Sequence, residues 1–218
     1  MNQRQSPISS QSPISSMSSL AARALLSVCV LLFALPASAH IDSSHVASGF
    51  TSSGFVSGLL HPLSGLDHLL AIFAVGVWAS QHQGRARRAL AVVFPVMMVA
   101  GAVLGSLGLV FSGMEAGIAI SVAVLGVLIA RSIRLSTSVG ALLVACFALA
   151  HGYQHAVEMS AAHSLYAYCA GFAVSTVLIL VSGLALGTGS TRMFARSARR
   201  WTGAVIATAG MYFIFAVV

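Results

Sequence analysis

Long apolar runs separated by short polar segments dominate the chain from about residue 54 to its end. Each run has about 18 to 26 residues, which is long enough for an α-helix to cross a hydrocarbon core of about 30 Å. The pattern therefore predicts an all-α, polytopic membrane protein with six transmembrane helices. We expect these helices over residues 54–79, 89–111, 112–130, 139–158, 164–187 and 201–218.

The first 39 residues follow a different pattern. A repeated hexamer, QSPISSQSPISS, has no apolar face to bury, which is typical of a disordered leader. After it come Arg23, an apolar run of about 13 residues and the small residues Ala37-Ser38-Ala39, the order found in cleavable secretory signal peptides. This run is too short to span a bilayer.

The leader and signal peptide would thus occupy residues 1–39, and the mature chain would begin at His40 in the periplasm. A short periplasmic segment over 40–53 would precede the membrane domain over 54–218. The sequence leaves open whether translation starts at Met1 or at Met17.

Composition supports the membrane assignment and excludes a nucleic-acid-binding protein. Of the residues, 58% are hydrophobic and only 7% are charged, whereas soluble domains carry about 25% charged residues. The net charge is +7, but all eleven basic residues are arginines in short clusters between apolar runs. Such clusters are typical of topology determinants, whereas a nucleic-acid site is a basic patch on a soluble face. We expect membrane lipid, and no nucleic acid, around this chain.

The loops predict the orientation in a bacterial inner membrane. With the mature N-terminus in the periplasm, every arginine of the mature chain falls on the cytoplasmic side, as the positive-inside rule requires. The four acids and seven of the eight histidines fall on the outer side or in the outer half of a helix; only His82 is cytoplasmic. Outer carboxylates and imidazoles, with guanidinium groups inside, attract cations from the periplasm.

The first predicted helix carries HPLSGLDHLL, with ionisable groups that are costly in a bilayer. His61 and His68 are seven residues apart, so two turns of an unbroken helix would place them on nearly the same face, with Asp67 offset by about 100°. Pro62 removes a backbone N–H and is expected to open or kink this helix, and a carbonyl freed there would be a further oxygen ligand.

The fourth predicted helix carries HGYQHAVE. His151, His155 and Glu158 are spaced i, i+4 and i+7, which places them on one stripe of the helix. Because the first helix descends from outside and the fourth ascends to outside, both sets reach a similar depth. Their nitrogen and oxygen ligands suit a borderline divalent ion such as Ni²⁺, Co²⁺ or Zn²⁺, and are poor for Cu(I).

Other residues leave alternatives open. Glu158 is either a ligand or an interfacial carboxylate, and Glu115 is either an accessory ligand or a carboxylate that interacts with a helix dipole. His40, His45 and His163 are either a periplasmic capture set or solvated loop residues. Gly101 with Gly105, and Gly183 with Gly187, predict close helix packing. Six helices also permit a 3+3 inverted repeat, with a site helix opening each half, although the halves show no residue-by-residue similarity.

Three segments together resemble the HupE/UreJ family, small membrane proteins associated with nickel-dependent hydrogenases and ureases: HPLSGLDHLLAIFAVGVWA, EAGIAISVAVLGVLIA and FALAHGYQHAVEM. The similarity covers nearly the whole mature chain, and its first motif is long and specific. The resemblance implies a nickel permease, in some members a cobalt permease, with six helices after a cleaved signal. It implies metal-associated positions at His61, Asp67, His68, His151, His155 and Glu158.

The first motif is also similar to the HX4DH signature of larger nickel/cobalt transporters. Here five residues separate His61 from Asp67, so ligand geometry does not transfer from that signature.

We therefore predict an importer of Ni²⁺ or Co²⁺ with no permanently bound cofactor and an indirect link to a nickel-dependent hydrogenase or urease. The chain contains no nucleotide-binding P-loop. The main alternative is an intramembrane zinc hydrolase, with Asp67, His151 and His155 as ligands and Glu158 as acid or base. A b-type cytochrome with paired histidines is a second alternative. The sequence leaves open the choice of metal, proton coupling and homo-oligomer formation.

Overall fold

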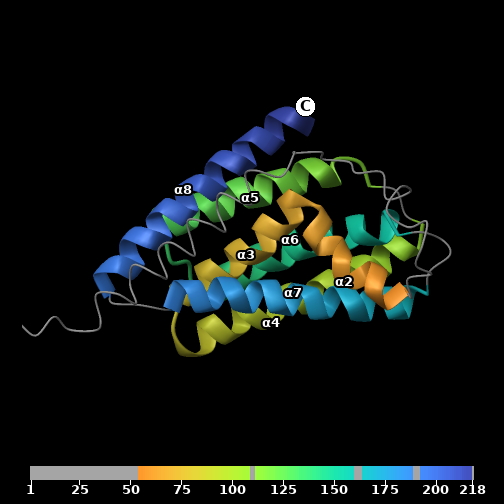
Figure 1. Ribbon diagram of the computed structural model, residues 1–218, viewed down its shortest axis with the longest axis horizontal. Coiled ribbons are helices and arrows are strands. Elements are labelled where there is room, and N and C mark those ends of the chain that lie inside the picture. The colour runs from red at the N-terminus through yellow and green to blue at the C-terminus, as the bar shows by residue number, and fades with distance from the viewer. Residues whose placement is uncertain (1–53, 109–110, 160–163, 189–191, 218) are drawn as a thin grey trace, which may run out of the picture. The chain divides into compact units, whose positions relative to one another are not determined.

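The computed structural model describes residues 54–108, 111–159, 164–188 and 192–217, without the side chains of 192–196 and 217. These residues all belong to the unit Ala39–Val218. They form helices only, as predicted, and contain no strand (Figure 1). The predicted signal peptide, the periplasmic segment and His40, His45 and His163 lie outside the described residues. The helices are α2 (Gly54–Ser64), α3 (Leu66–Ser80), α4 (Gly84–Ser106), α5 (Met114–Ala130), α6 (Thr137–Val157), α7 (Leu165–Thr188) and α8 (Arg192–Val217).

Their length and hydropathy support a membrane protein. In the described part of the chain, α4, α6 and α7 are each long and apolar enough to span a bilayer, and α2 with α3 makes a fourth span if the two count as one. The apolar helix α5 has 17 residues, and α8 has 26 residues with arginines in its N-terminal half. A total of six crossings therefore stays a prediction.

The first predicted helix is broken at Gly65, which confirms the predicted opening or kink near Pro62 and divides the helix expected over 54–79 into α2 and α3. Gly65 has extended backbone angles (φ −99°, ψ 116°) between α2 and α3, and the two helix axes are bent by 82°. Pro62 lies inside α2, so the break falls three residues after it. The His61 carbonyl accepts a hydrogen bond from the Ser64 hydroxyl at 2.6 Å. The expected role of a freed carbonyl as a metal ligand stays a prediction.

Glycines bring the helices together in pairs, as predicted for Gly101, Gly105, Gly183 and Gly187. The pairs are α4 with α6, α5 with α8, and α2 and α3 with α7. A Cβ added to Gly101 would lie 2.3 Å from the Leu149 carbonyl oxygen, and one added to Gly183 would lie 2.3 Å from that of Phe73. Because backbone meets backbone in these contacts, the paired helices pack without intervening side chains.

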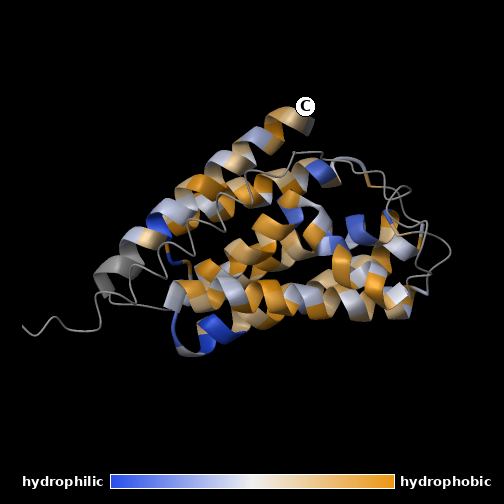
Figure 2. Ribbon diagram, viewed as in Figure 1, coloured by the Kyte–Doolittle hydropathy of each residue, from blue (hydrophilic) through white to orange (hydrophobic). Residues whose placement is uncertain are grey.

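The arginines gather at the end of the bundle where α3 finishes. Helix α4 begins at Gly84 rather than near residue 89, so Arg85, Arg87 and Arg88 lie in its first turns and not in a loop (Figure 2). Arg87 donates hydrogen bonds to the carbonyl oxygens of His82 (3.0 Å) and Ser80 (3.5 Å). The Trp78 indole N–H donates to the Ile133 carbonyl at 2.9 Å, which joins the C-terminal end of α3 to the segment that follows α5. We call this end the arginine end.

Candidate metal site

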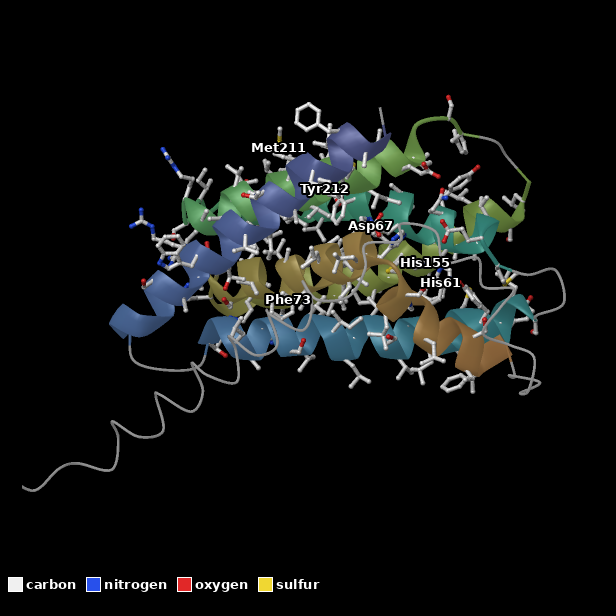
Figure 3. The ribbon with its side chains drawn as sticks, turned by 45° about the horizontal axis from the view of Figure 1, so that its top comes forward. His61, Asp67, Phe73, His155, Met211 and Tyr212 are labelled. Atoms are coloured by element: carbon white, nitrogen blue, oxygen red, sulfur yellow. The ribbon has the colours of Figure 1, made fainter. Side chains whose placement is uncertain are left out.

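The opposite end of the bundle holds three potential ligands in direct reach of one another. His61 lies in the last turn of α2, while His155 and Glu158 lie in the last turn of α6 and just past it. One donor atom from each of these three residues lies within 4.8 Å of the other two (Figure 3). With metal–ligand bonds of about 2.1 Å, ligands on opposite sides of an ion are about 4.2 Å apart, so a small inward movement would close this group on a metal.

Glu158 is held by two hydrogen bonds. Its Oε2 lies 3.0 Å from the His61 Nε2, and its Oε1 accepts from the Gln154 amide at 2.9 Å. Burial raises the pKa of this carboxyl, but the hydrogen bonds from His61 and Gln154 and the charges of His68 and His61 lower it further, so the net shift is downward. Glu158 is therefore an anion at neutral pH, as a cation ligand must be.

Two further histidines lie deeper, behind this group. The His68 ring centroid is 4.6 Å from that of His155 and 5.1 Å from that of His151. His151 Nδ1 donates to the Phe147 carbonyl at 2.8 Å, which leaves its Nε2 as a lone-pair donor when the ring is neutral. Among the described residues, the buried Nε2 atoms of His68 and His151 and both ring nitrogens of His155 have no hydrogen-bond partner.

Asp67 contacts His68 and does not belong to the compact group of three. Its Oδ1 accepts from the His68 backbone N–H at 2.8 Å and lies 2.9 Å from the His68 Nδ1. A carboxylate that receives the N–H of a histidine fixes the tautomer and orients the other ring nitrogen, here Nε2, toward a metal. The geometry thus favours a positioning contact for Asp67, where the sequence predicted a ligand.

Burial increases inward along this set of side chains. The exposed fraction of the side chain is 36% for Glu158 and 23% for His61, whereas His155 and His151 are fully buried. The site is therefore open to an ion at Glu158 and closed to solvent at the two α6 histidines. All six sequence-predicted residues lie at this end of the bundle, which we call the histidine end.

Helix α7 contributes two aromatic residues that sequence reasoning missed. The Phe172 ring stacks on His155 with centroids 5.4 Å apart, and the Tyr168 ring lies edge-on to His61 at 5.7 Å. The Tyr168 hydroxyl is buried and has no hydrogen-bond partner in the described part of the chain. The only sequence signal was a tyrosine and a phenylalanine at i, i+4 in an apolar helix, which is also typical of core packing.

Glu115 does not join the group. It lies exposed in the first turn of α5, the position in which a carboxylate interacts favourably with the helix dipole. Its accessory metal role stays a prediction.

Comparisons with known proteins identify relatives over most of the chain. The family model described as "HupE / UreJ protein" matches residues 28–213. A curated relative, "Protein HupE" from Rhizobium leguminosarum bv. viciae, is 37% identical over 177 residues, which cover 81% of this chain and 90% of the relative. No solved structure matches.

Proposed function

Because this chain belongs to the HupE/UreJ family, we propose that it is an inner-membrane permease that imports divalent nickel, or cobalt, from the periplasm to the cytoplasm. Proteins of this family are nickel permease-type transport proteins and not enzymes. Membership of this family therefore argues against the intramembrane zinc hydrolase. The direction of transport, the substrate site and the choice of metal are the parts that need testing.

One observation carries the proposal: four imidazoles and an anionic carboxylate from two separate regions of sequence meet at one end of an apolar bundle. Ionisable groups at membrane depth are costly and usually mark an ion pathway. Nitrogen and oxygen donors of this kind suit Ni²⁺ and Co²⁺. His61, His155 and Glu158 would take the ion first, His68 and His151 would receive it next, and Asp67 would hold His68 in its ligating tautomer.

The inside-negative membrane potential would drive the ion inward. A divalent cation that crosses the membrane gains about 4.6 kcal/mol per 100 mV, twice the value for one charge. The separation of charge along the bundle supports this direction, because the histidine end carries the carboxylates and the arginine end would face the cytoplasm. Each donor must also release the ion, so moderate affinity at the histidine end is expected.

The pairing of the helices supports the two finer predictions about architecture. If α2 and α3 form one span, the six spans divide into two halves of three. Exchange of the halves then interchanges the α4–α6 pair with the pair formed by α7 and the first span, and maps the α5–α8 pair onto itself. We therefore propose the 3+3 inverted repeat and six crossings. A periplasmic mature N-terminus is a separate proposal, which rests on the distribution of the arginines.

Uptake of radiolabelled nickel by cells that express the protein tests the function. His155→Gln and Glu158→Gln should reduce uptake to the background of cells without the protein, because each removes a donor from the compact group. The control is Tyr166→Phe. Tyr166 lies at the same end of the bundle but is 87% exposed, so loss of its hydroxyl should not affect the site. Equal membrane levels of all variants are required, and normal uptake by both site variants would refute the proposal.

Competition with unlabelled cobalt and zinc in the same assay ranks the metals. Reconstitution in liposomes that contain no other protein then separates transport by this chain from transport by a partner. Nickel entry that depends on an imposed inside-negative potential is the expected result, and entry without such dependence would contradict the proposed driving force.

A further inference from the structure

A second pair of buried donors lies at the arginine end, in the turn that joins α3 to α4. Gln81 and His82 follow the last residue of α3, and their exposed fractions are 5% and 6%. His68 lies near the start of the same helix. At a rise of 1.5 Å per residue, His82 is about 20 Å from His68 along the helix axis, so the two histidines belong to opposite ends of the membrane region.

His82 is oriented in the same way as His151. Its Nδ1 lies 3.1 Å from the Trp78 carbonyl oxygen, four residues earlier, just as His151 Nδ1 bonds to the Phe147 carbonyl. A carbonyl only accepts, so Nδ1 carries the proton and Nε2 of the neutral ring presents a lone pair. That Nε2 is buried and meets no hydrogen-bond partner in the described residues. Metal-binding histidines are commonly oriented by such a bond from the other nitrogen.

The residue before His82, Gln81, offers a buried amide oxygen. Its amide nitrogen donates to the Ile129 carbonyl at 3.1 Å. This contact fixes the orientation of the amide, since a flipped side chain would point its oxygen at another acceptor. Within the described chain the buried Oε1 has no donor. A buried polar atom without a partner costs about 1–3 kcal/mol, so a ligand or a water molecule that uses these two atoms would stabilise the turn.

The surroundings of this turn differ in charge from those of the histidine end. Arg87 donates to the carbonyl oxygens of His82 and Ser80, which fixes a positive charge close to the turn. The four carboxylates of the chain are Asp42, Asp67, Glu115 and Glu158, and the three described ones lie at the starts of α3 and α5 and the end of α6, away from this turn. Two neutral donors beside a guanidinium group bind a divalent ion weakly.

We propose that the His82 Nε2 and the Gln81 Oε1 form an inner release site for the transported divalent cation. The identity of this ion rests on the proposed function; the site itself rests on the two buried donors. Water completes the coordination of the ion, and the weak binding lets it leave toward the cytoplasm, because conduction needs sites that release as well as bind.

Fluorescence of Trp78 reports on this site directly. The chain has two tryptophans, so Trp201→Phe leaves Trp78 as the single fluorophore. The Trp78 and His82 rings have centroids 4.9 Å apart, and paramagnetic Ni²⁺ at the His82 Nε2 would quench the indole at such short range. Addition of NiCl₂ to the purified full chain in detergent should therefore quench Trp78 saturably. Diamagnetic Zn²⁺ should reverse the quenching by competition.

Variants assign the quenching to the site. In the Trp201→Phe background, His82→Phe should raise the NiCl₂ concentration for half-quenching at least tenfold, and Gln81→Glu should lower it about tenfold by adding a carboxylate. If His82→Phe does not fold, the shift in half-quenching measured for Gln81→Glu still tests the site. Unchanged half-quenching in both variants, or no saturable quenching, would overturn the inner site and favour a buried water molecule between these atoms.

The same titration separates this inference from the proposed function. His155→Gln should leave Trp78 quenching unchanged. In a calorimetric titration the unmodified protein should show two nickel-binding steps, and His155→Gln should remove the tighter one. Loss of Trp78 quenching in His155→Gln would show that quenching reports the histidine end, and would overturn the inner site. If calorimetry shows no step that His155→Gln removes while His82-dependent quenching persists, the proposed entry site fails and the inner site stands.

Discussion

The two ends of α3 use the same histidine chemistry in opposite electrostatic surroundings. At the histidine end, His68 contacts Asp67, His151 and His155, and the neighbouring His61 contacts His155 and Glu158. At the arginine end, His82 has a glutamine as its neighbour and the guanidinium of Arg87 on its own carbonyl. Both ends thus present buried imidazole nitrogens, and the fixed charges around them decide which end holds a cation more tightly.

This contrast separates two tasks that a permease needs. Capture from a dilute solution requires several donors and negative charge, the combination found at the histidine end. Release requires few donors and no negative charge, and we have proposed the turn after α3 for that task. Three predictions test the contrast, beginning with the largest effect.

The largest effect is expected from the close helix contact at the histidine end. Gly152→Ala would place a Cβ 1.8 Å from the Met98 carbonyl oxygen, a backbone atom of α4 that cannot move alone. Gly140→Ala, in the same helix at the arginine end, meets only the Trp78 ring at 3.2 Å and Leu90 at 3.4 Å. We expect Gly152→Ala to destabilise the protein by about 1–3 kcal/mol.

Gly140→Ala should be nearly neutral, because the gain of about 1 kcal/mol in helix propensity offsets a small side-chain adjustment. Thermal unfolding in detergent, followed by size-exclusion chromatography of the soluble fraction, measures both variants. Equal losses of stability would show that the α4–α6 contact is looser at Gly152 than the structure indicates.

The second prediction concerns the positioning contact of Asp67. Replacement of a residue that orients a metal-binding histidine typically costs about 10–100-fold in metal affinity. Asp67→Asn keeps an oxygen that can accept from the His68 Nδ1, so its loss should be near tenfold, and Asp67→Ala should approach a hundredfold. Calorimetric titration with NiCl₂ checks both. If Asp67→Asn abolishes binding as completely as His155→Gln does, Asp67 is a direct ligand, as the sequence first suggested.

The smallest effect is expected at Tyr168. Its hydroxyl is buried without a hydrogen-bond partner among the described residues, so Tyr168→Phe removes an unsatisfied polar group. Stability should stay unchanged or rise by about 1 kcal/mol, and the nickel concentration for half-maximal uptake should change less than about threefold. Thermal unfolding and radiolabelled uptake measure the two quantities, with Tyr166→Phe as the exposed control. A marked loss of uptake would instead place the hydroxyl on the ion or its water.

Sequence patterns predicted the helical class and the partners in the site because both depend on spacing. The i, i+4, i+7 positions of His151, His155 and Glu158 share a helix face whatever the rest of the chain does. The predicted convergence of the two sets is observed, since His61 contacts both His155 and Glu158, while their common depth in the membrane stays a prediction. The glycine pairs were readable for the same reason: close helix packing requires small residues at i, i+4.

Pro62 and its neighbouring glycines predicted a kink near Gly65, but not that the two helix axes would differ by 82°. A heptad separation puts His61 and His68 on one face only if the helix is continuous, and here they lie on two helices bent by 82°. They nevertheless meet at His155, because the bend brings the end of α2 to the α6 face that also receives His68. The contacts of Asp67, Tyr168 and Gln81 depend on side-chain rotamers and on neighbouring helices. Neither can be predicted from the spacing of residues in a single sequence.

The paired packing of the helices has a mechanical corollary. The potential metal ligands come from two different helix pairs. His61 and His68 lie in α2 and α3, which pack against α7, whereas His155 and Glu158 lie at the end of α6, which packs against α4. Glycine contacts hold the helices of each pair backbone to backbone, so a tilt of one pair against the other would separate the imidazoles while leaving the packing within each pair intact. In the proposed transporter, such a tilt is the motion that would release the ion.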